Sequence, residues 1–431
     1  MLQGKAKELT KKYGTTGFMY TEYPHKRFWT KDDIRHDLST NESMLYVHIP
    51  YCPKLCYFCT CHMSITNDYS KIKHYLEYLY KEINLVKLLE PNIKEIHLGG
   101  GSPTMLNKDD FSRLIEKLGE LVNIKTLDEF AIEIDPRKVD RDMMNFYADM
   151  GINRVSFGIQ DFNIEVQKAI NRIQPVEYIE NLLVPEIRNR FKNGVNFDII
   201  CGLPKQTLDS IRNACYEIVR LSPDRVCLNY LHYSPEMAKH QKLMGELPDF
   251  TQRKELFTEA LQVLTLGGYI RTGYDHFAKP TDANAKATRS KNVLWNSMGT
   301  TPGRVKDVIG VGVSSISNIN NHYFQNFYEL SDYETALDNG KFPNYRGHTM
   351  SEDDILRRDI IQSLRNYASA DIDKDYFKDE FEALKTFESD GLVMISGTSI
   401  AIREKEYSNL VCRVFDKFYD GSPFAPDLGE R

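Results

Sequence analysis

The chain has 431 residues, 41% of them hydrophobic and 27% charged, and its 55 basic and 61 acidic residues give a net charge of −6. This length exceeds one average domain, and the composition excludes a disordered or collagen-like chain. The negative charge argues against a nucleic-acid partner. No apolar run is long enough to span a bilayer and the N-terminus lacks the apolar core of a signal peptide, so we expect a cytoplasmic protein without stable membrane insertion.

The order of the predicted elements indicates an α/β protein in three parts. Residues 1–43 alternate between polar and aromatic and predict an N-terminal arm. Over residues 44–340, short β-branched or apolar runs alternate with helical patterns, which is typical of a parallel sheet with crossover helices. The predicted strands are 45–49, 95–98, 130–134, 154–158, 197–200 and 226–230. A further run at 269–274 extends this sheet or closes its edge.

The first crossover helix is predicted by a stripe of apolar residues at three- and four-residue intervals, namely Ile72, Leu76, Leu79, Ile83 and Val86. Beyond residue 340, two acidic helical patterns at 352–364 and 374–387 precede two short apolar runs at 391–395 and 399–402. This order predicts a small α+β C-terminal domain, residues 341–431, that resembles a winged helix. Its acidic balance argues against the nucleic-acid binding for which that shape is often used.

Four of the eight cysteines lie within ten residues after the first predicted strand, and these are Cys52, Cys56, Cys59 and Cys61. Three thiolates in the spacing C-x3-C-x2-C can bind three irons of a four-iron cubane and leave the fourth iron to an external ligand. A zinc site is the alternative, but it favours paired two-residue spacings and needs a fourth ligand. We expect Cys61 to lie beside the cluster. Among the scattered cysteines, Cys227 and Cys412 are predicted to be buried small hydrophobes.

Polar residues follow several of the predicted strands. Gly99 to Gly101 follow the second strand and would let the backbone approach a ligand closely. Glu133, Asp135, Gln160, Asp161, Asp198 and Cys201 lie at the ends of the next three strands. The carboxyl ends of parallel strands meet at one edge, so these residues predict a ligand site. For any one of them, a surface salt bridge or a helix cap is the alternative, and Arg172 taken alone would be a solvated charge.

The segment from Tyr46 to Cys61 resembles the cluster motif of radical S-adenosylmethionine (SAM) enzymes. More narrowly, it is similar to the oxygen-independent coproporphyrinogen III dehydrogenase group, to which class C radical SAM methyltransferases are related. The likeness continues through residues 99–104, 132–137, 158–163, 198–207, 275–278 and 310–314. It implies a partial (β/α)6 barrel, a [4Fe-4S] cluster on Cys52, Cys56 and Cys59, an electron donor such as flavodoxin or ferredoxin, and a monomer.

The resemblance also implies two SAM molecules. The first would chelate the open iron and touch Tyr46, Gly100 and Glu133, with Tyr46 and Glu133 in the catalytic role. The counterparts of the second SAM site are Phe58, Gly101, Ser102, Gln160, Arg172, Asp198, Leu231 and Ile316. Ser102 stands where threonine is common and Leu231 where alanine is common. Both changes keep the broad chemistry of the site.

The departures from the dehydrogenases lie in two segments associated with their substrate, which here are residues 19–26 and 296–304. Two aromatic positions of the second segment have become Ser297 and Thr300. We therefore predict a class C methyltransferase that uses the second SAM to methylate an sp2 carbon of an aromatic ring, a menaquinone-like quinone being the favoured substrate.

Two alternatives remain open. One is oxidative decarboxylation of two propionate side chains of a tetrapyrrole, coproporphyrinogen III, to vinyl groups. The other is a non-catalytic heme-handling or chaperone protein that has kept the cluster. In both enzymatic hypotheses the cofactors supply the radical chemistry and the protein supplies orientation.

Overall fold

The six predicted strands form the centre of one sheet in the computed structural model, which describes residues 12–13, 22–32, 41–296, 298–403 and 405–419. They are β1 (Glu42–Ile49), β4 (Asn92–Gly100), β5 (Glu129–Ile134), β6 (Arg154–Gln160), β7 (Val195–Cys201) and β8 (Arg225–Tyr230). Each is hydrogen-bonded in parallel to the next along the chain. The predicted (β/α)6 fold is therefore confirmed.

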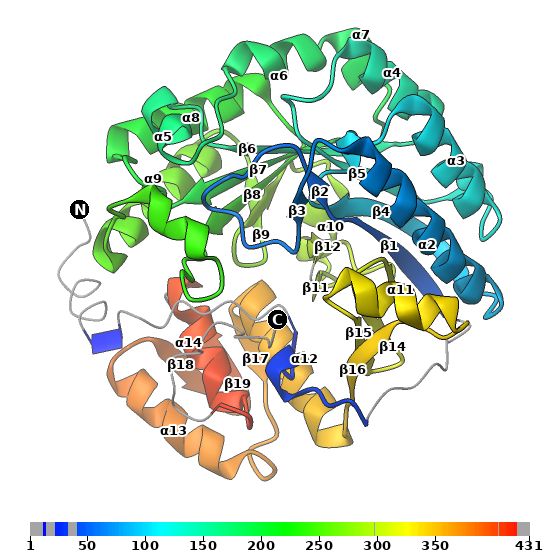
Figure 1. Cartoon of the computed structure of the whole chain (residues 1–431). Helices are drawn as coiled ribbons and strands as arrows, with labels where there is room; N and C mark the ends of the chain where they lie inside the picture. Colours follow the sequence, from blue (N-terminus) through cyan, green and yellow to red (C-terminus); the bar gives the residue numbers. More distant parts are fainter. Residues whose placement is uncertain (1–11, 14–21, 33–40, 297, 404, 420–431) are drawn as a thin grey trace.

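Helices cover the outer face of these strands (Figure 1). They are α2 (Tyr69–Lys87), α3 (Lys108–Gly119), α4 (Arg141–Asp149), α5 (Ile164–Ala169), α6 (Val176–Leu182), α7 (Pro185–Arg188), α8 (Leu208–Leu221) and α9 (Phe250–Leu266). Helix α2 begins at the N-cap Asp68, whose carboxylate accepts from the Ser70 N–H. All five residues of its predicted stripe are buried.

The sheet continues beyond these strands on both sides, and its outer strands run antiparallel. At one edge lie β10 (His276–Ala278) and β9 (Ile270–Thr272), formed by the run predicted at 269–274 and the residues that follow it. On the other side, β13 (Asp307–Val311) pairs in parallel with β1 and is followed by β14 (Ile316–Ile319), β15 (His322–Asn326) and β16 (Asn344–Thr349). The sheet is thus mixed and does not close on itself.

Two small strand pairs and two further helices lie outside the large sheet. Two small pairs of strands are β2 (Tyr51–Cys52) with β3 (Ser64–Ile65), and β11 (Leu294–Asn296) with β12 (Gly299–Thr301). Helix α10 (Ala283–Arg289) precedes β11, and α11 (Leu330–Asp338) joins β15 to β16. The β11–β12 hairpin therefore lies in the chain between the two sides of the open sheet.

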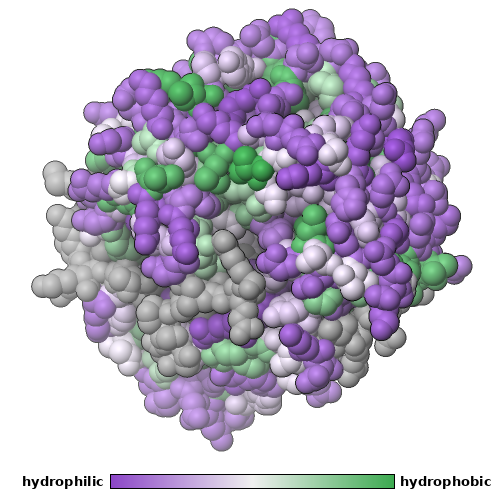
Figure 2. All heavy atoms as spheres, viewed as in Figure 1, coloured by the Kyte–Doolittle hydropathy of each residue, from purple (hydrophilic) through white to green (hydrophobic). Residues whose placement is uncertain are grey.

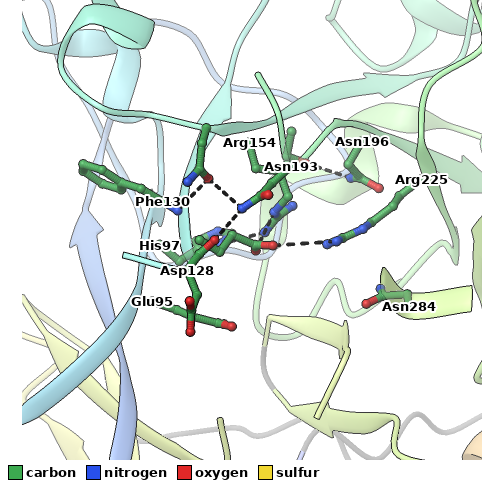
Figure 3. Close-up of polar contacts among 12 residues, drawn as sticks. Glu95, His97, Asp128, Phe130, Arg154, Asn193, Asn196, Arg225 and Asn284 are labelled. Atoms are coloured by element: carbon green, nitrogen blue, oxygen red, sulfur yellow. Dashed lines mark hydrogen bonds and ion pairs between the residues drawn. The ribbon is translucent and has the colours of Figure 1, made fainter. Parts of the chain in front are cut away.

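The inner face of the sheet is polar. Residues that alternate with buried apolar ones along the strands gather there, and they include Glu95, His97, Glu129, Glu133, Arg154, Ser156, Asn196, Asp198 and Arg225. At the starts of β5, β6 and β8, Arg154 Nε donates to Glu129 Oε1 at 2.7 Å and Arg225 Nη2 lies 3.6 Å from Glu129 Oε2. Figure 3 shows Arg154, Asn196 and Arg225 inside the barrel. These ion pairs fill the floor of the barrel, where apolar layers fill many (β/α)8 barrels.

The C-terminal part contains the two predicted helices and the predicted hairpin. Its elements are α12 (Glu352–Tyr367), β17 (Ser369–Asp371), α13 (Lys378–Ser389), β18 (Val393–Ser396), β19 (Ser399–Ile402) and α14 (Ser408–Cys412). They share an apolar cluster that also takes in Tyr23 from the N-terminal segment. The division at residues 43 and 340 stays a prediction, and β16, beyond residue 340, belongs to the large sheet.

The four cysteines outside the cysteine loop are buried. Cys227 and Cys412 are buried, as predicted. Within the described residues, no helix combines the length and apolarity required to cross a membrane. Figure 2 shows a mainly hydrophilic face on which hydrophobic side chains form small groups.

Glu129 gives a test of the barrel floor. Glu129→Gln should lower the free energy of unfolding by about 3 kcal/mol, because it removes the carboxylate that pairs with the half-buried Arg154 and one of the two that pair with the buried Arg225. Urea denaturation at pH 7 measures this change. Glu120→Gln is the control, since Glu120 is an exposed carboxylate paired with Lys87 and Lys117. Equal stability of the two variants would contradict the assignment of a structural role to the floor.

Candidate active site

The cysteine loop follows β1 at the carboxyl ends of the parallel strands, where α/β sheets place their sites. Its backbone is held from two sides. The Tyr57 N–H donates to Ile170 O at 3.0 Å, and Asn171 Nδ2 donates to Leu55 O at 2.8 Å. From the 3-10 helix Lys239–Met244, Gln241 Nε2 donates to Phe58 O at 2.9 Å. The loop position of the three thiols is thus fixed by hydrogen bonds from distant parts of the chain.

Two guanidinium groups approach the sulfur of Cys56. Arg172 Nη1 lies 3.5 Å and Arg137 Nη2 3.7 Å from Cys56 Sγ. Both arginines also pair with the buried Asp135, at 3.7 and 2.7 Å. Burial alone would raise the pKa of Asp135, but hydrogen bonds from Arg137 and the charge of Arg172 hold it below its ordinary value.

The thiols differ in their surroundings. Burial raises the pKa of Cys52 to about 12, whereas a hydrogen bond from the Cys61 thiol lowers that of Cys59 to about 7. Cys61 therefore lies directly beside Cys59. In the described part of the chain, no three His, Cys, Asp or Glu side chains surround one point as a single metal ion requires. A cubane makes a different demand, because each of its three thiolates binds a separate iron, and this donor set fits it.

Next to the cysteine loop, the inner faces of β1, β4 and β5 carry a connected polar network. The hydroxyl of Tyr46 lies 3.1 Å from His48 Nδ1. His97 Nε2 is 3.1 Å from Glu133 Oε1, and the backbone N–H of Gly100 donates to Glu133 Oε2 at 3.3 Å. Burial lowers the pKa of His48 to about 4 and raises that of Tyr46 well above its ordinary value. Both rings are therefore neutral at pH 7.

The glycine run leaves no space for side chains. A Cβ on Gly100 would lie 2.9 Å from the His48 ring, and its φ of +118° is a conformation that L side chains rarely adopt. A Cβ on Gly101 would lie 2.9 Å from the backbone N and O of Tyr51. The run therefore packs its backbone directly against β1 and the start of the cysteine loop. In the next turn, the Ser102 hydroxyl lies 2.7 Å from that of Thr104.

Further along the sheet, a bulge in β6 changes the direction of Gln160. The register with β7 shifts between Gly158 and Gln160, and Gln160 is buried with φ +67°. Such bulges and strained residues occur often beside functional sites. On β7, Asp198 accepts from Ser156 Oγ at 3.0 Å and from Asn196 Nδ2 at 2.8 Å. Burial and the nearby charge of Glu133 raise the pKa of Asp198.

The structure brings most of the predicted site residues together, but not all of them. Phe58 and Leu231 share an apolar cluster beside the cysteine loop. Arg172 is buried, and its Nη2 donates to Gly158 O at 2.7 Å. Ile316 lies on β14 and packs against a separate cluster with Trp29. Asp161 accepts from Gln206 Nε2 at 2.7 Å and from the Asn163 N–H at 2.6 Å, which is a structural role.

Seven polar residues of the inner face were not predicted, namely Glu95, His97, Glu129, Arg154, Ser156, Asn196 and Arg225. The signal that could have found them is a two-residue alternation, since the strands of a sheet covered on both faces are usually apolar throughout. Of the two segments associated with substrate, residues 19–21 and Ser297 lie outside the described residues. In the described part, Thr300 is buried and its backbone N–H faces His276 Nε2 at 3.5 Å.

This combination of an open α/β barrel, a cysteine triplet after the first strand and a glycine run after the second defines the radical SAM class. The model of the Radical SAM superfamily matches residues 46–218, from β1 into α8. Membership implies a [4Fe-4S] cluster and SAM as cofactors.

Relatives that match nearly the whole chain identify the family within this superfamily. The chain is 34% identical to the oxygen-independent coproporphyrinogen III oxidase of Pseudomonas aeruginosa over 95% of both chains. It is 35% identical to the enzyme of that name from Escherichia coli, over 95% of this chain and 94% of the other. The solved structure of coproporphyrinogen III oxidase from Escherichia coli superposes with a TM-score of 0.86 and 33% identity, covering 93% of this chain and 97% of that one. The chain belongs to the oxygen-independent coproporphyrinogen III oxidase family.

These relatives correct the functional prediction. The methyltransferase assignment, with its quinone substrate, was wrong, because the relatives that match nearly the whole chain are oxidases. That assignment depended on replaced aromatic positions in one segment. At Thr300 the structure gives a reason for the error. A Cβ on Gly273 would lie 3.0 Å from Thr300 Oγ1, so the residue packs against the β9–β10 turn, and its identity reflects local packing.

The cysteine assignments can be tested separately. Cys52→Ala, Cys56→Ala and Cys59→Ala should each abolish the cluster, because each variant leaves one iron without its protein ligand. Cys61→Ala is the matched control and should keep it. Iron analysis and the visible absorbance of anaerobically purified protein measure cluster content. A full cluster in any of the first three variants would overturn the ligand set.

Proposed function

We propose that this chain converts two propionate side chains of coproporphyrinogen III to vinyl groups by oxidative decarboxylation. The observation that carries the proposal is the similarity to coproporphyrinogen III oxidases, which covers 95% of the chain and so extends well beyond the radical SAM core at residues 46–218. The polar network of β1, β4, β5 and β7 supports it, because a charged cofactor and a substrate with several carboxylates need polar partners inside the barrel.

In this proposal Cys52, Cys56 and Cys59 hold the cluster, and Tyr46, Gly100 and Glu133 bind the SAM next to it. When bound, cluster and SAM together supply a carbon radical strong enough to take a hydrogen atom from an unactivated C–H bond. The chain provides orientation. Glu133 is held by His97 and by the Gly100 N–H, so its carboxylate has a defined direction before the ligand arrives.

Each conversion removes one hydrogen atom, one molecule of carbon dioxide and one electron from the propionate side chain. The β-carbon of a propionate loses a hydrogen atom, and the bond between the α-carbon and the carboxylate then breaks. Carbon dioxide leaves, one electron passes to an external acceptor, and a vinyl group remains. Two such events turn one coproporphyrinogen into the divinyl product. A one-electron donor such as flavodoxin or ferredoxin starts each event, and we propose that the chain acts as a monomer.

We also propose that the chain binds a second SAM molecule. Its contacts would come from Phe58, Gly101, Ser102, Gln160, Arg172, Asp198, Leu231 and Ile316. Asp198 supports this assignment most clearly, since its buried carboxylate is oriented by Ser156 and Asn196 within the polar interior. Arg172 is placed between Asp135 and Cys56, where its guanidinium reaches the cysteine loop. Ile316 belongs to the other side of the sheet and is the weakest member of the set.

The second SAM site predicts a binding stoichiometry. The wild-type chain with its cluster should bind two SAM per chain, and Asp198→Asn should bind one, because a neutral amide loses the charge-assisted contact to the ligand. Anaerobic equilibrium dialysis with labelled SAM measures this. Asp142→Asn removes an exposed carboxylate on α4 and is the control. One SAM per wild-type chain would contradict a second site.

The reaction predicts the fate of labels. With SAM that carries a CD3 group, coproporphyrinogen III should give unlabelled divinyl product and two molecules of carbon dioxide, because the methyl group of SAM does not enter the product. Anaerobic assay with mass spectrometry measures both. A product that gains a deuterated methyl group, or intact propionates with no carbon dioxide, would refute the proposed reaction.

A further inference from the structure

The β11–β12 hairpin lies at the side of the barrel that the sheet leaves open. It follows α10 next to β9 and β10, and it leads into β13 on the other side of the molecule. Asn284 Nδ2 of α10 donates to Thr300 O at 2.9 Å, and beyond the hairpin Arg304 Nη2 lies 3.1 Å from the buried Glu95 of β4. Figure 1 shows β11 and β12 between the barrel strands and α12.

On its inner side the hairpin rests against His276. Across three neighbouring strands, His276 pairs with Cys227 and Cys227 pairs with Asp198, so the histidine lies two strand spacings, about 10 Å, from the Asp198 backbone. Its Nδ1 is 2.7 Å from Asp275 Oδ1, which leaves Nε2 to face Thr300 N. A Cβ on Gly299 would lie 2.5 Å from Nε2, so only glycine lets the hairpin sit this close.

On its outer side the hairpin is held by α12 of the C-terminal part. Gln362 contacts both backbone groups of Trp295, accepting from its N–H at 3.1 Å and donating to its carbonyl at 2.7 Å. Asn366 Nδ2 donates to Val293 O at 3.1 Å. The guanidinium of Arg365 lies 3.7 Å from the centre of the Trp295 ring and 3.8 Å from Asp275 Oδ2. Trp295 is thus enclosed between α12 and His276, whose ring centroid is 5.4 Å away.

The charges in this arrangement are almost fully buried, with Arg365 1% and Asp275 0% exposed. Burying a guanidinium and a carboxylate is unfavourable unless each has a partner. An apolar pair at this position would stabilise the contact between α12 and the barrel equally well. A charge pair fixes direction in addition. Here it sets the orientation of the Asp275 carboxylate, and through it the His276 ring on which the hairpin rests.

We propose that Arg365, Asp275 and His276 form a clamp that fixes the β11–β12 hairpin as the side wall of the barrel, where it rests on His276, two strand spacings from Asp198. The C-terminal domain thereby takes part in positioning the tetrapyrrole that reacts inside the barrel. The three are positioning residues, since none needs to touch substrate. This inference rests on the proposed function and adds to it the element that holds the substrate against the radical site.

Trp295 is a built-in reporter of this clamp. The chain has two tryptophans, so Trp29→Phe leaves Trp295 as the only one. In this background, Arg365→Met and Gln362→Leu should each raise acrylamide quenching of Trp295 fluorescence about 2-fold, because the hairpin opens locally more often. The number of vinyl groups formed per 5′-deoxyadenosine should fall about 10-fold relative to the Trp29→Phe parent, because a loosely held substrate misses the radical. Cluster iron is measured in every variant.

Arg365→Lys distinguishes charge from shape. Arg365 forms a single long ion pair with Asp275 and not a bidentate one. A lysine at this position should therefore restore the ratio of vinyl groups to 5′-deoxyadenosine to within about 3-fold of the parent. If Arg365→Met does not fold, Gln362→Leu carries the test, since it removes the two hydrogen bonds to Trp295 and one from Asn366 but leaves the buried charges in place.

Quenching that stays at the parent level in Arg365→Met and Gln362→Leu would overturn the clamp. Increased quenching with an unchanged product ratio would overturn its role in positioning. A Trp29→Phe parent and wild-type chain that both form no vinyl groups would instead refute the proposed function, and the quenching result would still decide the clamp.

Discussion

The rest of the barrel depends on the ion pairs that the buried carboxylate of Glu129 forms with two arginines. Glu129 binds Arg154 and Arg225, the first residues of β6 and β8, and so joins three strands through one side chain. Burial alone would raise its pKa, but the two arginines lower it to about 2, and the group stays ionised at neutral pH. A barrel floor made of ion pairs keeps the interior polar and leaves the inner face of the strands available for charged ligands.

This floor is linked to the candidate active site by direct contacts. Arg154 Nη2 lies 3.4 Å from His97 Nδ1, and the opposite ring nitrogen of His97 faces Glu133. The orientation of Glu133 is therefore set by a chain of side chains that begins at the bottom of the barrel. Polar groups that are fixed in this way lose little freedom when a ligand binds, which is the contribution that a protein makes to radical chemistry supplied by its cofactors.

The sequence predicted the elements with strong local signals and missed those that depend on distant partners. The six central strands are apolar runs, α2 has a clear helical stripe, and the spacing of Cys52, Cys56 and Cys59 is a local property. In contrast, the apolar residues of β14 to β16 are interrupted by asparagine, glutamine, glycine and histidine, and the pairing of Asp275 with Arg365 joins residues 90 positions apart. The reaction was predicted wrongly because the replaced residue Thr300 was taken as a substrate contact, whereas it packs against Gly273.

In the proposed reaction, a propionate of coproporphyrinogen III gives up its hydrogen atom in this active site. The most direct measurement uses coproporphyrinogen III deuterated at the β-carbons of its propionates, incubated anaerobically with the reduced enzyme and unlabelled SAM. We expect 5′-deoxyadenosine to carry deuterium from the substrate while vinyl groups form. Deuterium-free 5′-deoxyadenosine together with fully retained propionates would contradict it.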